Sequence, residues 1–344
     1  NESEMDKQFL KVLAGEKTGQ VPFWFMRQAG RYLPEYRELR AKKGGFLDMA
    51  FDPKAACEIT MQPIRRFGMD AAIIFSDILT IPLALGQHLE FAAGEGPKLE
   101  ELNIAGLNYQ PDKLQPVYDA LSETSSQLKA EGFSNTALIG FAGAPWTVAT
   151  YMVEGGGSKD FSKVKKMAYG QPKEFAQLID ILTETTADYL IKQVDAGAEA
   201  LQIFDSWAGA LDPHGFQFQS IEPTKKIVAQ VKAAHPNIPI IGFPRGAGIH
   251  TRAYANQTGI DAVALDSLMC TMWARDNLQP MMPVQGSLDP MRLYAGGDGL
   301  KKAATKILRD FSGGQHIFNL GHGIHKETPI EHVEELVKVI REFK

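Results

Sequence analysis

The chain has 344 residues, of which 44% are hydrophobic and 22% are charged, and its formal net charge is −5. This composition is typical of a folded globular protein, and the acidic net charge argues against a nucleic-acid partner, whose binding favours a basic face. No apolar run approaches the roughly 18 residues of a membrane span. The start, Asn1 to Met5, has no apolar h-region, and two cysteines, Cys57 and Cys270, suit a reducing compartment, so we expect a cytoplasmic protein.

Short β-branched or aromatic runs recur along the chain, with amphipathic helical stretches between most of them. This alternation predicts βα units around a parallel sheet. We count eight runs: Val21–Met26, Ala71–Phe75, Thr136–Phe141, Ala200–Phe204, Pro239–Phe243, Asp261–Leu265, Met282–Gln285 and His316–Leu320. A typical helix between them is expected over Pro172 to Ala196, with Gly197 after its end. Eight units predict an α/β fold, a single-domain (β/α)8 TIM barrel over residues 1–344 with a short N-terminal extension at about residues 1–6.

The first run is followed by an arginine cluster within fourteen residues, made of Arg27, Arg31, Arg37 and Arg40. A guanidinium stays protonated and offers a planar fork of donors that matches a carboxylate, so the cluster predicts a receptor for one small polyanionic ligand. The alternative is a solvated helix face on which Glu35 and Glu38 pair with these arginines.

Asp77 follows the second run and is flanked by apolar residues. It could cap the next helix, which is the ordinary role of an aspartate at a strand-to-helix turn. If it faces the cavity instead, its carboxylate could accept N–H groups of a ligand or stabilise a cation that forms during a reaction.

The third run leads into small residues and Pro145, which would let a bulky ligand approach the backbone, with Tyr151 one turn beyond Thr147. Tyr151 could offer a phenolic donor or pack on the core. Two insertions, residues 86–115 and 151–171, could border or cover the barrel mouth. The glycines at 155–157 indicate a hinge, a close approach of backbone to ligand, or a plain turn.

Polar or special residues stand at the strand ends, where a barrel carries its chemistry: Arg27, Asp77, Pro145, Asp205, Ser206, Arg245, Asp266, Asp289 and His322. Ser206 has no histidine near it in sequence, which favours ligand binding over acyl chemistry. His322 lies between glycines and is open to a ligand. His322 and His325 could mark a metal site, but no carboxylate or cysteine ligand accompanies them. Gly246 and Gly248 lack the full fingerprint of a nucleotide loop.

Two long motifs, Phe25–Pro34 and Gly140–Gly157, are highly specific, and three shorter ones accompany them at Ile74–Leu79, Phe204–Gly209 and Asn319–Gly323. With these motifs the chain resembles the uroporphyrinogen decarboxylase family from about Lys7 to Arg341. The resemblance implies a homodimeric barrel that removes carbon dioxide from the four acetate side chains of uroporphyrinogen III, giving coproporphyrinogen III. It also implies that neither a metal nor an organic cofactor is used.

The resemblance also implies the roles of particular residues. The catalytic residues would be Asp77, Arg27 and Tyr151, with Asp77 binding the pyrrole N–H groups and Arg27 aiding proton delivery. The substrate-binding residues would be Arg27, Gln28, Arg31, Arg40, Asp77, Tyr151, Ser206 and His322. The segments Leu265–Ser267 and Gln285–Pro290 depart from the family pattern, which concerns the shape of the mouth on that side.

Two other classes of function remain open. A corrinoid or coenzyme-M methyltransferase would share the fold but needs zinc held by histidine and cysteine, and neither Cys57 nor Cys270 has a histidine close by in sequence. A non-catalytic tetrapyrrole carrier would keep the pocket without turnover. Zinc analysis separates the first from a decarboxylase, and a turnover assay separates the second.

Overall fold

The fold is seen in a computed structural model that describes residues 6–344. Its centre is a curled sheet of seven strands in the order β1-β4-β5-β6-β7-β8-β9, in which all neighbours are parallel. The strands are β1 (Ala71–Ile73), β4 (Ala137–Gly143), β5 (Ala200–Asp205), β6 (Ile240–Pro244), β7 (Ala262–Ala264), β8 (Val284–Gln285) and β9 (His316–Ile317). Seven of the eight predicted strands are therefore confirmed. The predicted N-terminal extension falls almost wholly on residues 1–5, outside the described chain.

The first predicted strand does not form a regular ladder, because only Phe23 makes a bridge, parallel to Phe318. The segment is nevertheless bonded on both sides. Trp24 N donates to Phe318 O at 3.3 Å, and Asp70 N donates to Phe23 O at 3.0 Å. The Phe23 N–H is taken by the Asp70 carboxylate at 2.9 Å instead of by a neighbouring strand. This segment therefore lies between β9 and β1 and closes the sheet into a barrel. The Asp70 carboxylate takes the place of a backbone acceptor that a neighbouring strand would otherwise supply.

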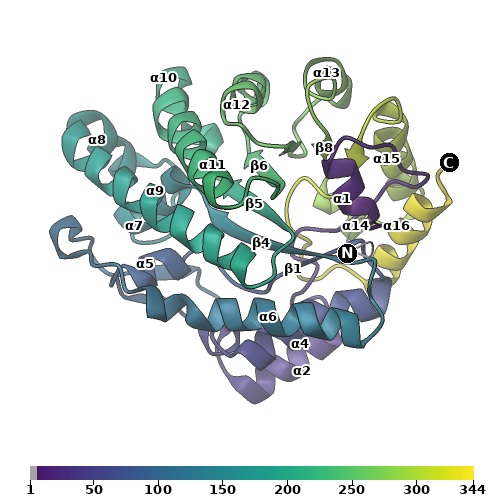
Figure 1. Ribbon diagram of the computed structural model, residues 1–344, viewed down its shortest axis with the longest axis horizontal. Helices are drawn as coiled ribbons and strands as arrows, with labels where there is room; N and C mark the ends of the chain where they lie inside the picture. The colour runs from purple at the N-terminus through teal and green to yellow at the C-terminus, as the bar shows by residue number, and fades with distance from the viewer. Residues whose placement is uncertain (1–5) are drawn as a thin grey trace.

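Helices surround the sheet on its outer face, and the first and last helices, Gln8–Leu13 and Ile330–Glu342, lie on the same side of the molecule (Figure 1). The predicted helix at 172–196 is confirmed as α9, and Gly197 beyond it has a φ of 124°, which favours glycine. The helices are α1 (Gln8–Leu13), α2 (Pro34–Lys43), α3 (Phe46–Ala50), α4 (Pro53–Phe67), α5 (Thr80–Ala84), α6 (Gln115–Ala130), α7 (Pro145–Glu154), α8 (Ser162–Gly170), α9 (Pro172–Asp195), α10 (Pro213–Gly215), α11 (Glu222–Ala234), α12 (Thr251–Gln257), α13 (Thr271–Asn277), α14 (Pro290–Ala295), α15 (Gly297–Asp310) and α16 (Ile330–Glu342). None of the helices between residues 6 and 344 combines the length and apolar character needed to cross a bilayer.

The insertion at 86–115 contains an antiparallel hairpin that the sequence did not predict, formed by β2 (Leu89–Phe91) and β3 (Pro97–Leu99). It lies against the glycine run after α7. Leu99 N donates to Gly155 O at 3.0 Å, and a Cβ added to Gly156 would lie 2.8 Å from Pro97 O. The glycines therefore permit a close approach of backbone, and the backbone that approaches is the hairpin.

The inside of the barrel is filled, and a chain of buried polar side chains crosses it. Trp24 Nε1 donates to Gln285 Oε1 at 2.8 Å, and Gln285 Nε2 donates to Gln202 Oε1 at 2.9 Å. All three side chains are fully buried. Because the strands are parallel, their carboxyl ends meet at one edge, which we call the mouth, and the residues that follow each strand gather there.

Candidate active site

Arg27 begins the mouth, directly after the segment that closes the barrel. Its position is fixed on one side by Ile324 N, which donates to Met26 O at 3.0 Å. Arg27 itself has a φ of 57°, a left-handed conformation that is uncommon outside glycine and is found at functional sites. Its side chain passes over Gly323, where a Cβ would lie 2.7 Å from Arg27 Cγ. Gly323 is thus needed so that Arg27 and His322 can share the mouth.

Asp77 lies between β1 and α5 and is half-buried. Its Oδ1 accepts a 2.7 Å hydrogen bond from Leu79 N, while no donor among residues 6–344 bonds its Oδ2. Burial raises the pKa of Asp77 to about 6, against the opposing effects of the Leu79 N–H and the Arg27 charge. The capping interpretation is wrong, because the N-cap of α5 is Leu79 and no side chain caps this helix. Asp77 Oδ1 instead bonds within the turn that precedes α5, and Oδ2 has no protein donor in the described chain.

Tyr151 and His322 enter the mouth from α7 and from the loop after β9. Burial raises the pKa of Tyr151, and the Asp77 carboxylate raises it further. Burial also lowers the pKa of His322 to about 3, helped by the charges of Arg245 and Arg27. The same two arginines act on Tyr151. These mutual effects place all five groups in one electrostatic environment. At neutral pH the tyrosine is protonated and the histidine is uncharged, with one donor and one acceptor nitrogen.

Arg31 and Arg40 gather around the buried hydroxyl of Tyr36 on α2. Burial raises the pKa of Tyr36, while the charges of Arg40 and Arg31 oppose this rise. The Tyr36 ring lies 5.9 Å from that of Phe75, two residues before Asp77. The charges of these two arginines therefore lie near Tyr36, whose ring is close to that of Phe75.

The alternative in which Glu35 and Glu38 neutralise the arginine cluster is not what the structure contains. Glu35 pairs with Arg66 of α4 at 3.1 Å. Arg37 donates to the backbone oxygen of Arg31 at 2.8 Å and so belongs to the local structure. Within residues 6–344, no carboxylate lies within the 4.0 Å ion-pair distance of the three remaining arginines of the cluster, Arg27, Arg31 and Arg40, or of Arg245 after β6.

Gln28 is placed differently from the other predicted site residues. Only 1% of its surface is exposed, and its side-chain amide is used by the barrel wall. Phe25 N donates to Gln28 Oε1 at 3.0 Å, and Gln28 Nε2 donates to Ala71 O at 3.0 Å. Ser206, in contrast, is half-buried at the end of β5. The structure therefore brings Ser206 to the mouth and places the Gln28 side chain beneath it.

Several other strand-end residues have structural partners. Asp266 accepts hydrogen bonds from Gly246 N at 2.6 Å and Leu268 N at 2.9 Å. Asp289 caps α14 through Met291 N at 2.9 Å. Arg245 is the residue that the prediction of site residues left out, although its place at the end of β6 matches that of Arg27 and Asp77. The sequence indicated Arg245 only by its position at a strand end, because no other arginines lie close to it in the chain.

No three histidine, cysteine, aspartate or glutamate side chains of the described chain come close enough to hold one metal ion. The His325 ring packs on Tyr294, with ring centroids 4.6 Å apart, and its Nδ1 accepts a hydrogen bond from Glu327 N at 3.2 Å. His325 is therefore already partnered, and the His322–His325 pair lacks further ligands.

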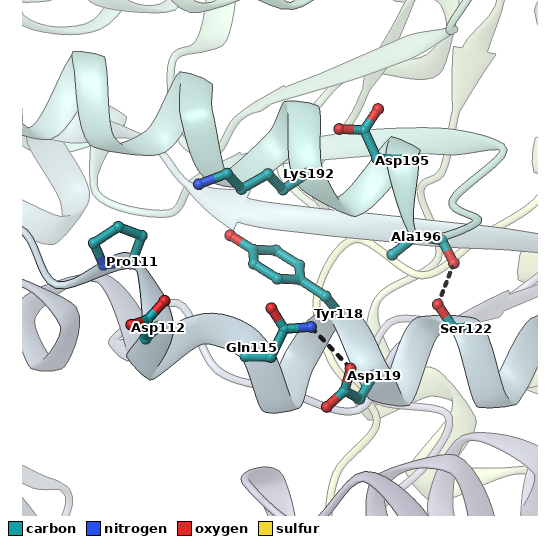
Figure 2. A pocket seen from close by; sticks show the side chains of 9 residues that line it. All are labelled: Pro111, Asp112, Gln115, Tyr118, Asp119, Ser122, Lys192, Asp195 and Ala196. Carbon is teal, nitrogen blue, oxygen red and sulfur yellow. Dashed lines mark hydrogen bonds between the residues drawn. The ribbon is translucent and has the colours of Figure 1, made fainter.

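A separate hollow of about 400 Å³ lies outside the barrel between α6 and α9 (Figure 2). It is lined by Pro111, Asp112, Gln115, Tyr118, Asp119, Ser122, Lys192, Asp195 and Ala196. Two of its four charged side chains have an ionic contact, since Lys192 lies 2.9 Å from Asp188 and Asp195 lies 2.8 Å from His235. The unpaired charges of the mouth are a stronger sign of a ligand site than the size of this hollow.

The sequence matches the family described as Uroporphyrinogen decarboxylase (URO-D) over residues 4–343. The uroporphyrinogen decarboxylase of Rhizorhabdus wittichii is 52% identical over 336 residues, which are 96% of this chain and 96% of that protein. The uroporphyrinogen decarboxylase of Rhodospirillum rubrum is 48% identical over 343 residues, 98% of each.

Solved structures resemble the fold. A methyltransferase from Methanosarcina mazei superposes with a TM-score of 0.81 at 20% identity, covering 97% of both chains. A B12-independent methionine synthase from Shewanella sp. W3-18-1 does so with a TM-score of 0.54 at 12% identity, covering 95% of both. At these identities the likeness concerns the fold alone, and it confirms the predicted α/β barrel class.

Proposed function

Since this chain belongs to the uroporphyrinogen decarboxylase family, we propose that its mouth binds uroporphyrinogen and that Asp77 and Arg27 take part directly in removing carbon dioxide from its acetate side chains. The chain is a decarboxylase of tetrapyrrole biosynthesis by this membership. The roles of single residues, the absence of a cofactor and the assembly of the protein are proposals that rest on its geometry.

The observation that carries the proposal is the state of Asp77. One of its oxygens is committed to Leu79 N, and the other is free of protein donors among residues 6–344 while burial raises the pKa of the group to about 6. An acceptor in such a place suits a ligand that brings its own N–H groups. The pyrrole N–H groups of a puckered macrocycle converge on its centre, so one carboxylate can accept them.

The unpaired arginines supply the complement to the substrate's eight carboxylates. Arg27, Arg31 and Arg40 come from one side of the mouth, and we add Arg245 from the end of β6. None of them forms an ion pair with another residue of the chain from 6 to 344. Tyr151, Ser206 and His322 would contact the substrate as hydrogen-bonding groups. Gln28 would act from the wall, by holding Phe25 and β1 in place.

The chemistry needs a place for the electrons of the breaking carbon–carbon bond. Protonation of the pyrrole α-carbon makes an iminium-like cation in the substrate, and the electrons flow into it as carbon dioxide leaves. The methylene carbon then takes up a proton and the α-carbon loses one, so each acetate consumes one proton and becomes a methyl group. The ionised Asp77 stabilises the cation, and no external electron sink is required.

Arg27 is our choice for aiding proton delivery, because its charge acts on both Asp77 and His322. A guanidinium is a weak general acid, so its role would be to orient the donor or the carboxylate next to it. His322 is unsuited to donate as an imidazolium, since its pKa is lowered to about 3. Tyr151 keeps its proton at neutral pH and can donate a hydrogen bond.

The deciding experiment uses metal-stripped protein, incubated without oxygen with uroporphyrinogen III, followed by oxidation and separation of the porphyrins by carboxylate number. Stepwise appearance of products with seven to four carboxylates would support decarboxylation without metal or cofactor. Binding without loss of carbon dioxide would support the tetrapyrrole carrier instead. Decarboxylation that depends on zinc restored to the protein would contradict the proposal that no metal is needed.

A second copy of the chain is the partner we propose for the rim of the mouth. Exposed apolar side chains follow β6, β7 and β8, with Ile249 70% exposed and Leu268 89% exposed. Such side chains are unusual on a monomer's surface when they gather in one region. Sedimentation analysis should show a dimer that Leu268→Glu weakens. Tyr169→Glu is the control, because Tyr169 is 53% exposed on α8, apart from α12 and α13 in Figure 1. A monomeric parent protein would contradict the dimer.

A cytoplasmic location remains a proposal. It is supported by the two free cysteines, Cys57 and Cys270, which suit a reducing compartment.

A further inference from the structure

A fully buried carboxylate lies just below the mouth at the end of β5. Asp205 has no exposed surface, and its two oxygens accept hydrogen bonds from two hydroxyls on different elements. Thr147 of α7 donates to Oδ1 at 2.5 Å, and Ser220 of the π-helix η4 (Phe216–Ile221) donates to Oδ2 at 2.5 Å. Within residues 6–344 Asp205 has no cationic partner. A buried carboxylate without a counter-ion is costly, so its retention calls for a reason.

The Thr147 hydroxyl connects Asp205 to the residues that follow β5 at the mouth. It donates to Asp205 and accepts a 3.1 Å hydrogen bond from Trp207 N. The neighbouring Trp146 donates from Nε1 to Trp207 O at 2.9 Å. The first turn of α7 therefore holds both backbone polar groups of Trp207, and the Trp207 ring lies 6.1 Å from the ring of Tyr151.

Two proposed substrate contacts depend on this connection. Ser206 lies between Asp205 and Trp207 in the chain, so its backbone is fixed at both neighbours. Tyr151 lies four residues after Thr147, on the same face of α7. The Ser220 hydrogen bond, in contrast, ties down η4, which carries none of the proposed substrate contacts.

We propose that Asp205 is a positioning residue, which acts through Thr147 to set Tyr151 and Ser206 at the spacing the reaction needs. This inference rests on the proposed function, and Asp205 itself does not touch the substrate. Burial raises the pKa of Asp205 to about 6, against the two hydroxyl bonds, which agrees with an acceptor surrounded by protein. The competing explanation is that the network only stabilises the fold.

The test is a graded series at Thr147. Thr147→Val keeps the shape and removes the hydroxyl, Thr147→Cys offers a weaker donor, and Thr147→Ser keeps a strong one. We expect kcat to fall about 10- to 100-fold in Thr147→Val, by several-fold in Thr147→Cys, and to be restored in Thr147→Ser, because small misplacements of catalytic groups are costly. KM should change less, since the arginines hold the substrate.

Ser220→Ala is the matched control, because it breaks a bond of equal length to the same carboxylate. It should lower the melting temperature, though by less than Thr147→Val, which also removes the acceptor of Trp207 N, while kcat stays within about twofold. Equal loss of kcat in both variants, or no restoration by Thr147→Ser, would overturn the proposal. Thr147→Cys and Thr147→Ser carry the comparison if Thr147→Val does not fold.

A measurement without substrate separates this inference from the proposed function. Hydrogen exchange at Trp207 N–H should be faster in Thr147→Val than in Thr147→Ser, since its acceptor is the Thr147 hydroxyl. Unchanged exchange would overturn the link through Thr147. If the parent protein exchanges as expected but does not decarboxylate uroporphyrinogen, the proposed function fails while the link from Asp205 to Trp207 stands.

Discussion

The two edges of the barrel use charged residues in opposite ways. At the edge where strands begin, Glu199 accepts Lys7 at 2.7 Å and Leu138 N at 3.1 Å. Asp261 does the same there with Lys232 at 2.6 Å and Ile240 N at 2.8 Å. Each acid thus pairs with a cation and also bonds a backbone N–H near the start of a strand, the second of β4 for Glu199 and the first of β6 for Asp261.

At the mouth the charges have no such partners. Arg27, Arg31, Arg40 and Arg245 are without an ion pair within residues 6–344, and Asp77 has one oxygen unused by the protein. Leaving the desolvated Asp77 carboxylate without a cationic partner costs stability, which a fold tolerates where a ligand completes the site. We therefore distinguish Glu199 and Asp261, which stabilise the fold, from Asp77, which is proposed to bind a ligand. Replacing a carboxylate by an amide tests this distinction at both edges.

Asp77→Asn should have the largest effect. We expect turnover to fall about 100-fold or more, because the amide cannot stabilise the cation. The free energy of unfolding at pH 7.5 should rise by about 1–3 kcal/mol, since the raised pKa of Asp77 means that the folded protein disfavours its charge. Porphyrin analysis and thermal melting measure the two quantities. Full turnover with unchanged substrate affinity would remove Asp77 from the mechanism.

Glu199→Gln should give the reverse result. It leaves the ammonium of Lys7, whose side chain is 11% exposed, without its carboxylate. We therefore expect the free energy of unfolding to fall by about 2–3 kcal/mol, while kcat and KM stay within about twofold. Chemical denaturation and steady-state kinetics provide the measurements. Glu95→Gln, which breaks a surface pair with Lys98, is the control and should change neither. A large loss of kcat in folded Glu199→Gln would contradict the view that acids at this edge stabilise the fold without taking part in the reaction.

The pH dependence sharpens the same contrast. The folded pKa of Asp77, about 6, lies above its ordinary value of 3.8, so the carboxylate is protonated as pH falls through 6. We expect kcat/KM to decline below about pH 6, approaching tenfold per pH unit. The decline should vanish in Asp77→Asn. Its persistence there would point to another group, and Asp205, whose pKa is also about 6, would be the first to examine.

The sign for stability follows from the same values. Because burial raises the folded pKa of Asp77, the folded protein binds the proton more tightly, and the free energy of unfolding falls as pH rises from about 4 to above 6. Asp77→Asn has no carboxylate at this position, so it lacks this decrease in the free energy of unfolding. The stability difference between the two proteins should therefore be small below pH 4 and reach its full size above about pH 7, which calorimetry at several pH values can follow.

The sequence predicted what local patterns determine. Seven strands were found because each is a short apolar run, and the arginine cluster was found because Arg27, Arg31 and Arg40 lie close together in the chain. The first strand was mispredicted as regular because its N–H groups bond to distant side chains, among them Asp70 and Asn319. No pattern in the neighbourhood of Phe23 carries that information.

The parts of the site that escaped prediction depend on long-range partners. The Asp205 network joins residues 58 and 15 positions away, so neither Thr147 nor Ser220 stands out in the sequence. The Gln28 side chain is turned into the wall by an acceptor on β1, 43 positions away. The hairpin β2–β3 was missed because its strands are three residues each and are interrupted by turn residues.

Arg245→Gln gives the smallest effect that still tests the mouth. If Arg245 binds a substrate carboxylate, KM for uroporphyrinogen should rise about tenfold with little change in kcat, and Arg245→Lys should recover part of this loss, because an ammonium keeps the charge without the fork. Arg252→Gln replaces an exposed arginine on the adjacent α12 and is the control, which should leave KM within about twofold.

The pKa of His322 should rise when the Arg245 charge is removed. Burial is the larger cause of the lowered pKa, so the imidazole should still be neutral at pH 7. Steady-state kinetics and the NMR titration of His322 would decide the matter. Equal KM values for Arg245→Gln and Arg252→Gln would show that Arg245 does not bind the substrate. The proposed carboxylate receptor would then consist of Arg27, Arg31 and Arg40.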